Sequence, residues 1–86
     1  MSWDVIWHPR TGDVLMELAK RDAATARRIR QRVTAFAQTG QGDVKKLEGR
    51  GNQWRLRVGN WRAIFVFEPP GSITVLFVTD RRDAYR

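Results

Sequence analysis

The most informative run of residues in this sequence is Trp54-Arg55-Leu56-Arg57-Val58-Gly59-Asn60-Trp61-Arg62. Apolar and arginine residues alternate on both sides of the Gly-Asn pair. Strict alternation is typical of a half-buried strand, and two such runs around Gly-Asn indicate a tight antiparallel hairpin. If Gly59 and Asn60 form the turn, one face of the hairpin carries the apolar side chains. The other face carries Arg55, Arg57 and Arg62.

This arrangement of arginines would lower the stability of the fold. The hairpin pattern predicts that Arg57 lies opposite Arg62, and like charges directly opposite each other destabilise a strand pair. A surface that binds a polyanion would benefit from the same arrangement. The alternative is a solvated basic face whose charge is neutralised by nearby carboxylates.

Length and charge narrow the possible classes of function. Eighty-six residues are expected to form one domain, spanning residues 1–86. The chain has 16 basic and 9 acidic residues and a net charge of +7, which implies an acidic partner: nucleic acid, an anionic membrane or an acidic protein. Thirteen of the basic residues are arginines. This bias favours nucleic acid, because guanidinium groups bind phosphate bidentately and stack on bases.

Several site types are not expected. The chain has no cysteine, so it has no disulfide, thiolate or cysteine-based zinc chemistry, and its only histidine, His8, lacks a partner for a metal site. We expect His8 to lie at the surface near a strand end, and we expect no cofactor. No apolar run is long enough to span a bilayer and no signal-peptide pattern is present, so we expect a cytoplasmic protein without a membrane partner.

The first half of the chain predicts one strand and two helices. Residues 2–7 alternate, with tryptophans on one face, and indicate a strand. Residues 11–20 predict a short helix with Thr11 as its N-cap, and residues 22–38 predict a longer one that Asp22 can cap. The two helices are expected to be antiparallel. We expect the four tryptophans to pack in the core rather than to stack on bases.

Basic residues outside the hairpin are predicted to extend an RNA-binding surface, with a merely solvated helix face as the alternative. They are Arg27, Arg28 and Arg32 on the second helix and Lys45, Lys46 and Arg50 in the connection over residues 44–51. Arg30 lies near the buried stripe of that helix, so its side chain is expected to extend along the apolar surface to reach water.

The second half predicts strands over residues 53–58, 61–68 and 73–79. The last strand is almost continuously apolar, which is typical of an interior strand covered on both faces. Pairing Glu68 with Ile73 would place Arg62 opposite Thr79, with Arg81 just beyond on the arginine face. The expected fold is therefore α+β. Two N-terminal antiparallel helices pack on a four-stranded, mainly antiparallel sheet, in the order β-α-α-β-β-β.

The order of these elements and four motifs resemble the RelE/ParE superfamily of bacterial toxins. The motifs are Lys46-Leu47-Glu48-Gly49, the hairpin run quoted above, Val75-Leu76-Phe77-Val78 and Arg81-Arg82-Asp83-Ala84-Tyr85-Arg86. The resemblance covers essentially the whole chain. Its motifs are fairly specific to the superfamily and much less specific for a branch within it.

The RelE branch implies a toxin that is a ribosome-dependent endoribonuclease, an mRNA interferase, which inhibits translation and needs no metal. Its reaction is attack of a ribose 2′-hydroxyl on the adjacent phosphate. By this resemblance the catalytic positions are Arg55, Arg57, Arg62, Arg81 and Tyr85. Since in-line transfer at phosphorus needs positive charge around the developing oxyanions, we expect Arg62 and Arg81 to hold the phosphate and Arg55 and Arg57 to stabilise the transition state. Tyr85 stacks on a base or takes part in proton transfer. The implied partners are the ribosome, its mRNA and an acidic, partly disordered antitoxin.

The chain also departs from the family pattern. Some members carry lysine where Arg55 and Arg57 stand, and arginine effectively cannot lose a proton, so the general base is open. Asp80 stands where many relatives carry histidine or lysine, and it can act as a base or pair with Arg81.

Two alternatives to RNA cleavage remain. One is the ParE branch, which poisons DNA gyrase without being an enzyme and shares the fold. The other is a family member that serves only as a stable partner in an operon-repressing complex.

Overall fold

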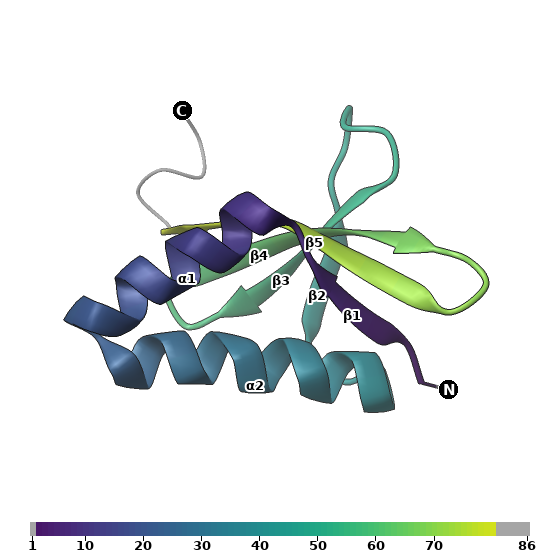
Figure 1. Ribbon diagram of the computed structural model, residues 1–86. Helices are drawn as coiled ribbons and strands as arrows, with labels where there is room; N and C mark the ends of the chain where they lie inside the picture. Colours follow the sequence, from purple (N-terminus) through teal and green to yellow (C-terminus); the bar gives the residue numbers. More distant parts are fainter. Residues whose placement is uncertain (1, 81–86) are drawn as a thin grey trace.

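Two helices cover one face of a five-stranded sheet in the computed structural model of the chain, which describes residues 2–80 (Figure 1). The α+β class and the antiparallel helix pair are as predicted. The elements follow the order β1 (Asp4–Trp7), α1 (Pro9–Arg21), α2 (Ala23–Thr39), β2 (Asp43–Lys46), β3 (Gln53–Val58), β4 (Trp61–Glu68) and β5 (Ser72–Asp80).

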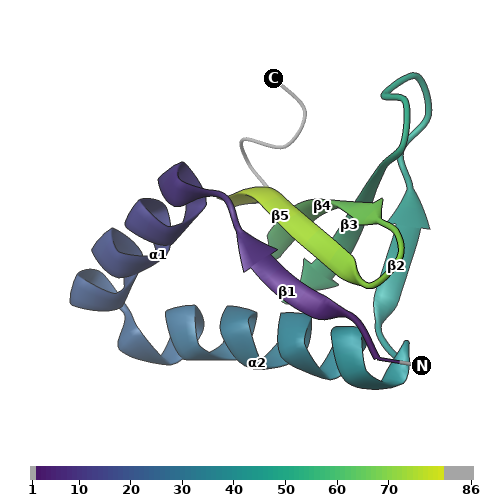
Figure 2. The same ribbon diagram turned by 45° about the vertical axis from the view of Figure 1, so that its right-hand side comes forward.

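The sheet has one strand more than predicted. Its order is β1-β5-β4-β3-β2, with β1 parallel to β5 and the other pairs antiparallel (Figure 2). The additional strand is β2, in the region expected to be a basic connection, and it pairs along β3 from Asp43 opposite Arg57 to Lys46 opposite Trp54. Four residues with a single apolar member carry little pattern of their own. The prediction of four strands was wrong because pairing with β3 makes β2 a strand.

The central hairpin has the predicted register. Val58 lies opposite Trp61 and Arg57 opposite Arg62, with Gly59 and Asn60 as the turn. Gly59 has a φ of 60°, and glycine at the first central position suits a type II′ turn, whose twist matches that of the flanking strands. The turn thus fixes which side chains share a face.

The pairing of β4 with β5 contains a bulge that the sequence did not reveal. Glu68 lies opposite Ser72 rather than Ile73, whereas Arg62 lies opposite Thr79 as predicted. The register shifts by one residue between Ile64 and Phe65, where Leu76 has no partner on β4. A bulge inserts one unpaired residue in this way. Because of this bulge, the predicted pairing is wrong by one residue from Phe65 to Glu68 and correct from Trp61 to Ile64.

Helix α1 begins two residues earlier than predicted, and its cap differs. Pro9 is its first residue, a position where proline's missing N–H costs nothing. His8 is the N-cap, and its Nδ1 accepts a hydrogen bond from the backbone N–H of Arg10 at 3.2 Å. Thr11, the predicted cap, is instead 1% exposed, and its hydroxyl donates to the Leu76 carbonyl at 2.6 Å. Thr11 therefore attaches α1 to the bulge.

Helix α2 begins as predicted and lines the core. The Asp22 carboxylate accepts from the backbone N–H of Thr25 at 3.1 Å, as an N-cap does. Its buried side chains meet the inner face of the sheet in a single cluster, which includes Ile29, Val33, Phe36, Leu56, Phe65, Ile73 and Val75. All four tryptophans are partly buried against this cluster, as expected. The Arg30 guanidinium lies over the Trp7 ring, 5.6 Å from its centroid.

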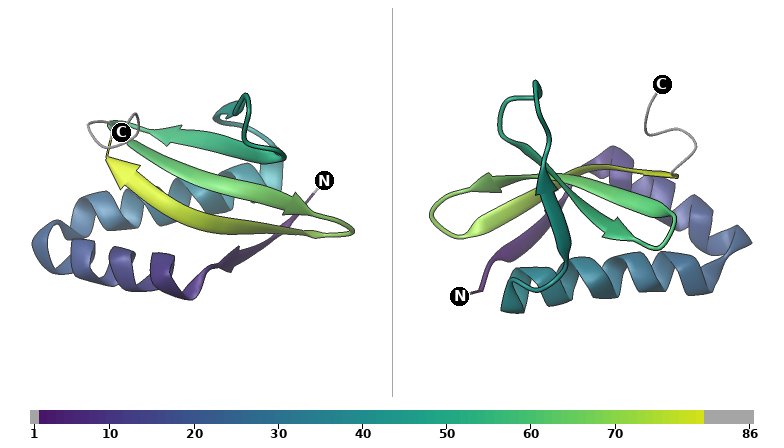
Figure 3. Two further views of the ribbon diagram at one scale, coloured as in Figure 1. Left: turned by 90° about the horizontal axis from the view of Figure 1, so that it is seen from above. Right: turned by 180° about the vertical axis from the view of Figure 1, so that it is seen from behind.

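The face of the sheet turned away from the helices, here called the outer face, carries no helix over β3, β4 and β5 within residues 2–80 (Figure 3, left). The prediction that β5 is covered on both faces was therefore wrong: Phe77 is 39% exposed. Strand β5 lies between β1 and β4 in the sheet, but the helices pack against only one of its two sides.

Candidate nucleic-acid interface

Three arginines stand on the outer face and are here called the arginine face: Arg55, Arg57 and Arg62. Their neighbours in the chain, Leu56, Val58 and Ala63, are at most 5% exposed on the inner face. Arg57 lies opposite Arg62, which lies opposite Thr79, and on its other side Arg57 lies opposite Asp43. The residues of this row thus come from four adjacent strands.

Arg55 is fixed by a residue of β2. Its Nη1 donates to the Asp43 carboxylate oxygen Oδ1 and to the Asp43 backbone carbonyl, both at 3.2 Å. The side chain of Arg55 is 18% exposed and that of Asp43 is 57% exposed. Arg55 is therefore held towards the edge of the sheet formed by β2.

Arg57 and Arg62 have different surroundings although they face each other. The Nε of Arg57 donates to the Gly59 carbonyl at 3.3 Å, so this exposed side chain leans towards the hairpin turn. Arg62 is half-buried. Of the two like charges predicted to be unfavourable, Arg57 is thus attached to an acceptor at the turn.

The other two predicted catalytic positions, Arg81 and Tyr85, lie outside the described residues. Asp80 is the last described residue, at the end of β5, where it lies opposite Trp61. Since side chains alternate along a strand, this register puts Asp80 on the side of the sheet opposite to Arg62. The geometry therefore gives no support to Asp80 as a base acting at the arginine face.

The remaining predicted RNA-binding residues divide between two regions. Lys45 lies opposite Arg55 on β2, and Lys46 and Arg50 are exposed beside it and in the following loop. On α2, Arg28 is near the hairpin, because its Nη1 lies 3.5 Å from the place that a Cβ on Gly59 would occupy. The exposed Arg27 and Arg32 belong to the same helix, in the layer beneath the sheet.

Two residues of the outer face were not singled out from the sequence. Asp43 was placed in a loop, because the short run around Val44 carries little strand pattern of its own. Ile64 is 4% exposed and lies opposite Arg55 on one side and Phe77 on the other. The arginines therefore adjoin an apolar part of the same face.

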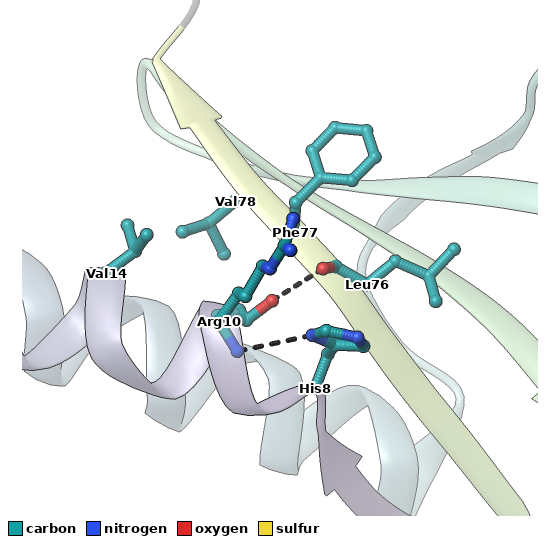
Figure 4. Close-up of a pocket in the computed structure, with 7 residues that line it drawn as sticks. His8, Arg10, Val14, Leu76, Phe77 and Val78 are labelled. Atoms are coloured by element: carbon teal, nitrogen blue, oxygen red, sulfur yellow. Dashed lines mark hydrogen bonds between the residues drawn. The ribbon is translucent and has the colours of Figure 1, made fainter.

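A cleft of about 360 Å³ between α1 and β5 was not predicted (Figure 4). Figure 4 shows Arg10 and Val14 rising from α1 on one side and Phe77 on β5 on the other. Val14 is 45% exposed and Met16, farther along α1, is 60% exposed. The cleft is lined by His8, Arg10, Thr11, Val14, Leu76, Phe77 and Val78.

The described part of the chain offers neither a metal-binding cluster nor a membrane-spanning helix. Within residues 2–80, no three histidine or acidic side chains gather in a way that could hold a metal ion. The same residues contain no helix long and apolar enough to cross a membrane. His8 is exposed at the end of β1, as predicted.

Solved structures of toxins and toxin–antitoxin complexes share this fold. The RelE–RelB complex from Pyrococcus horikoshii matches with a TM-score of 0.75 and 27% identity, over 98% of this chain and 100% of that chain. The chain belongs to the RelE/ParE superfamily of toxins. No protein-family model matches the sequence, and no curated protein matches it either.

Two more distant RelE/ParE structures share the fold. The YoeB/ParE toxin from Agrobacterium tumefaciens matches with a TM-score of 0.77 and 16% identity, over 90% of this chain and 96% of that chain. The DinJ–YafQ toxin–antitoxin complex from E. coli matches with a TM-score of 0.73 and 10% identity, over the full length of both chains. At these identities the two likenesses show the fold alone, and the superfamily inferred from the sequence motifs is supported by the match to RelE.

Proposed function

We propose that this chain is the toxin of a type II toxin–antitoxin pair and that it cleaves mRNA on the ribosome as an endoribonuclease. The observation that carries the proposal is the arginine face, where Arg55, Arg57 and Arg62 stand on one uncovered side of two paired strands. The match to an archaeal RelE over nearly the whole chain supports the RelE-like branch.

Phosphodiester cleavage suits a cluster of fixed guanidinium groups. In the proposed reaction the ribose O2′ attacks the adjacent phosphorus, and the bond from phosphorus to the leaving O5′ breaks. The products are a 2′,3′-cyclic phosphate and a 5′-hydroxyl, while one proton leaves O2′ and one reaches O5′. Preorganised positive groups stabilise the negative charge that develops on the phosphoryl oxygens. We assign Arg62 and Arg81 to holding the phosphate, and Arg55 and Arg57 to stabilising that charge.

The arginines do not supply the proton acceptor, since a guanidinium stays charged at any pH at which proteins fold. Tyr85 stays a prediction for base stacking or proton transfer. Lys45, Lys46, Arg50 and Arg28 are proposed to hold the flanking RNA, because they are exposed around the arginine face or near its turn.

A translating system tests this function. The purified chain is added, and new message ends are mapped against the ribosome's reading frame. We expect ends at fixed positions within codons, and we expect their loss when Arg62→Ala is combined with Arg81→Ala. The matched control is Lys20→Ala combined with Arg21→Ala at the end of α1, which removes the same charge and should leave cleavage intact.

The opposite outcome would assign the chain to the ParE-like alternative. Intact message, together with DNA damage in cells that express the chain, would indicate a gyrase poison. A chain without either effect would fit the third possibility, a partner in a repressing complex.

We further propose that an acidic antitoxin is the partner of this chain. Neighbouring structures were solved as RelE–RelB, YoeB–YefM and DinJ–YafQ complexes. A net charge of +7 favours an acidic segment. We propose that this segment binds in the cleft between Val14 and Phe77, which is mainly apolar and has Arg10 among its lining residues.

Val14→Glu should weaken neutralisation by the antitoxin while leaving message cleavage unchanged. Equal neutralisation of variant and wild type would place the antitoxin elsewhere.

A further inference from the structure

We propose that Asp43 is a positioning residue that orients the Arg55 guanidinium for phosphate. The inference rests on the proposed RNA cleavage and adds a residue to that site. Asp43 belongs to β2, the strand that only the structure revealed. Its carboxylate and its backbone carbonyl both accept from the same nitrogen, Nη1 of Arg55, at 3.2 Å.

Two acceptors on one residue restrict the guanidinium more than a single ion pair does. The carbonyl belongs to the backbone of β2, which Asp43 enters by pairing directly with Arg57. The acceptor is therefore a backbone group of the paired sheet. Neither contact uses Nη2 or Nε, and a guanidinium presents its five N–H donors in one plane. Fixing Nη1 fixes the direction in which the other donors point, which is what bidentate binding of a phosphate requires.

A contribution to folding stability does not by itself account for the ion pair between Asp43 and Arg55. The Asp43 side chain is 57% exposed, and ion pairs that reach solvent contribute little to folding. A carboxylate beside arginines also opposes the binding of a polyanion, because it lowers the local positive potential. An aspartate at this position thus weakens RNA binding and improves the orientation of Arg55. These two effects have opposite signs, so one variant can separate them.

Asp43→Asn removes the charge and replaces the carboxylate by a weaker, neutral amide acceptor, while the backbone carbonyl stays. With the toxin in excess over programmed ribosomes, the cleavage rate at rising toxin concentration gives a half-saturating concentration and a maximal rate. We expect the half-saturating concentration to fall on the order of threefold, since one repulsive charge is lost. We expect the maximal rate to fall about tenfold, the lower end of what the loss of an orienting partner costs at metal sites.

Glu17→Gln is the matched control. It also removes one negative charge and one exposed ion pair, the contact of Glu17 with Lys20 at 3.1 Å, but on α1. Both kinetic parameters should stay at wild-type values. Thermal unfolding of each variant within a few degrees of wild type checks that the fold is kept. Unchanged parameters in Asp43→Asn, or changes as large in Glu17→Gln, would overturn the inference.

A second measurement tests the positioning even in a chain that cuts no message. In NMR spectra of the side-chain guanidinium groups, rotation about the Nε–Cζ bond of Arg55 should be slow in the wild type and faster in Asp43→Asn. The exposed Arg57 should not change. Equal mobility of Arg55 in both proteins would refute the role of Asp43. Absence of cleavage with a restrained Arg55 would instead refute the proposed function and leave this contact as an observed restraint.

Discussion

The two faces of β4 carry residues for opposite purposes. Towards the helices, Ala63 and Phe65 are each 1% exposed and pack in the core. Towards the outer face, Arg62 lies directly opposite Arg57, a pairing of like charges. The inner face stabilises the fold by burying apolar side chains, whereas the outer face includes a destabilising pair of like charges. The fold tolerates the repulsion between Arg57 and Arg62 because apolar burial on the inner face contributes more free energy.

This comparison supports the proposal that the outer face is the functional one. Residues that break a local stability rule without a structural gain are expected at functional sites. The arginine face is such a place, whereas the aromatic cluster of the inner face is fully explained by packing. Phe65 lies 5.2 Å from Phe36 and 5.3 Å from Phe67 between ring centroids. Substitutions on the two faces should therefore separate stability from activity.

The largest expected effect is on the inner face. Phe65→Ala should lower the free energy of unfolding by about 4 kcal/mol, because it removes a buried ring and leaves a cavity. Urea unfolding measures this loss. Phe77→Ala, on the exposed outer side of β5, should cost only about 1 kcal/mol. Similar losses at the two positions would remove the distinction between the faces.

The second effect is on the arginine face and concerns activity. Arg57→Ala should reduce message cleavage about 100-fold, as the loss of one preorganised donor does, with little change in unfolding because the side chain is exposed. Arg21→Ala, an equal charge loss at the end of α1, should retain activity. If Arg57→Ala unfolds the chain while cleavage per folded molecule is unchanged, the arginine serves the fold.

The third effect concerns the bulge of β5, which a hydrogen bond connects to α1. Thr11→Val keeps the side-chain shape but removes the buried hydrogen bond to the Leu76 carbonyl. We expect a loss of about 1.5 kcal/mol in the free energy of unfolding, since the carbonyl is left without this donor. Thr34→Val, exposed on α2, should be nearly neutral. Equal results for both variants would mean that α1 does not depend on this bond.

The smallest effect concerns the exposed cap of α2 and depends on pH. Hydrogen bonds from the Thr25 side chain and then from its backbone lower the pKa of Asp22 below its ordinary value. A lowered folded pKa stabilises the fold above the unfolded value, and this contribution is lost as the pH falls through the folded value. Asp22→Asn should therefore reduce Tm slightly at pH 7, and less in acid. A constant difference between pH 7 and pH 2 would show that the Asp22 charge contributes nothing.

Much of the fold was accessible from the sequence because the patterns that encode it are local. Period-two alternation placed β3 and β4, the Gly-Asn pair placed their turn, and apolar residues at helical spacing behind Asp22 placed α2. Each signal lies within a stretch that forms one element, so each residue's neighbours in the chain suffice to identify it. The arginine face followed directly from the alternation and the turn.

The tertiary structure decided what depends on residues distant in the chain. Strand β2 exists by pairing with β3, and the bulge at Leu76 is held by a hydroxyl from α1, 65 residues away. The partners of Arg55 and Arg57 likewise depend on which backbone each side chain can reach. The sequence alone determined which residues share a face, because side-chain alternation is a property of a single strand. Their contacts required the whole sheet, because hydrogen-bond partners come from neighbouring strands.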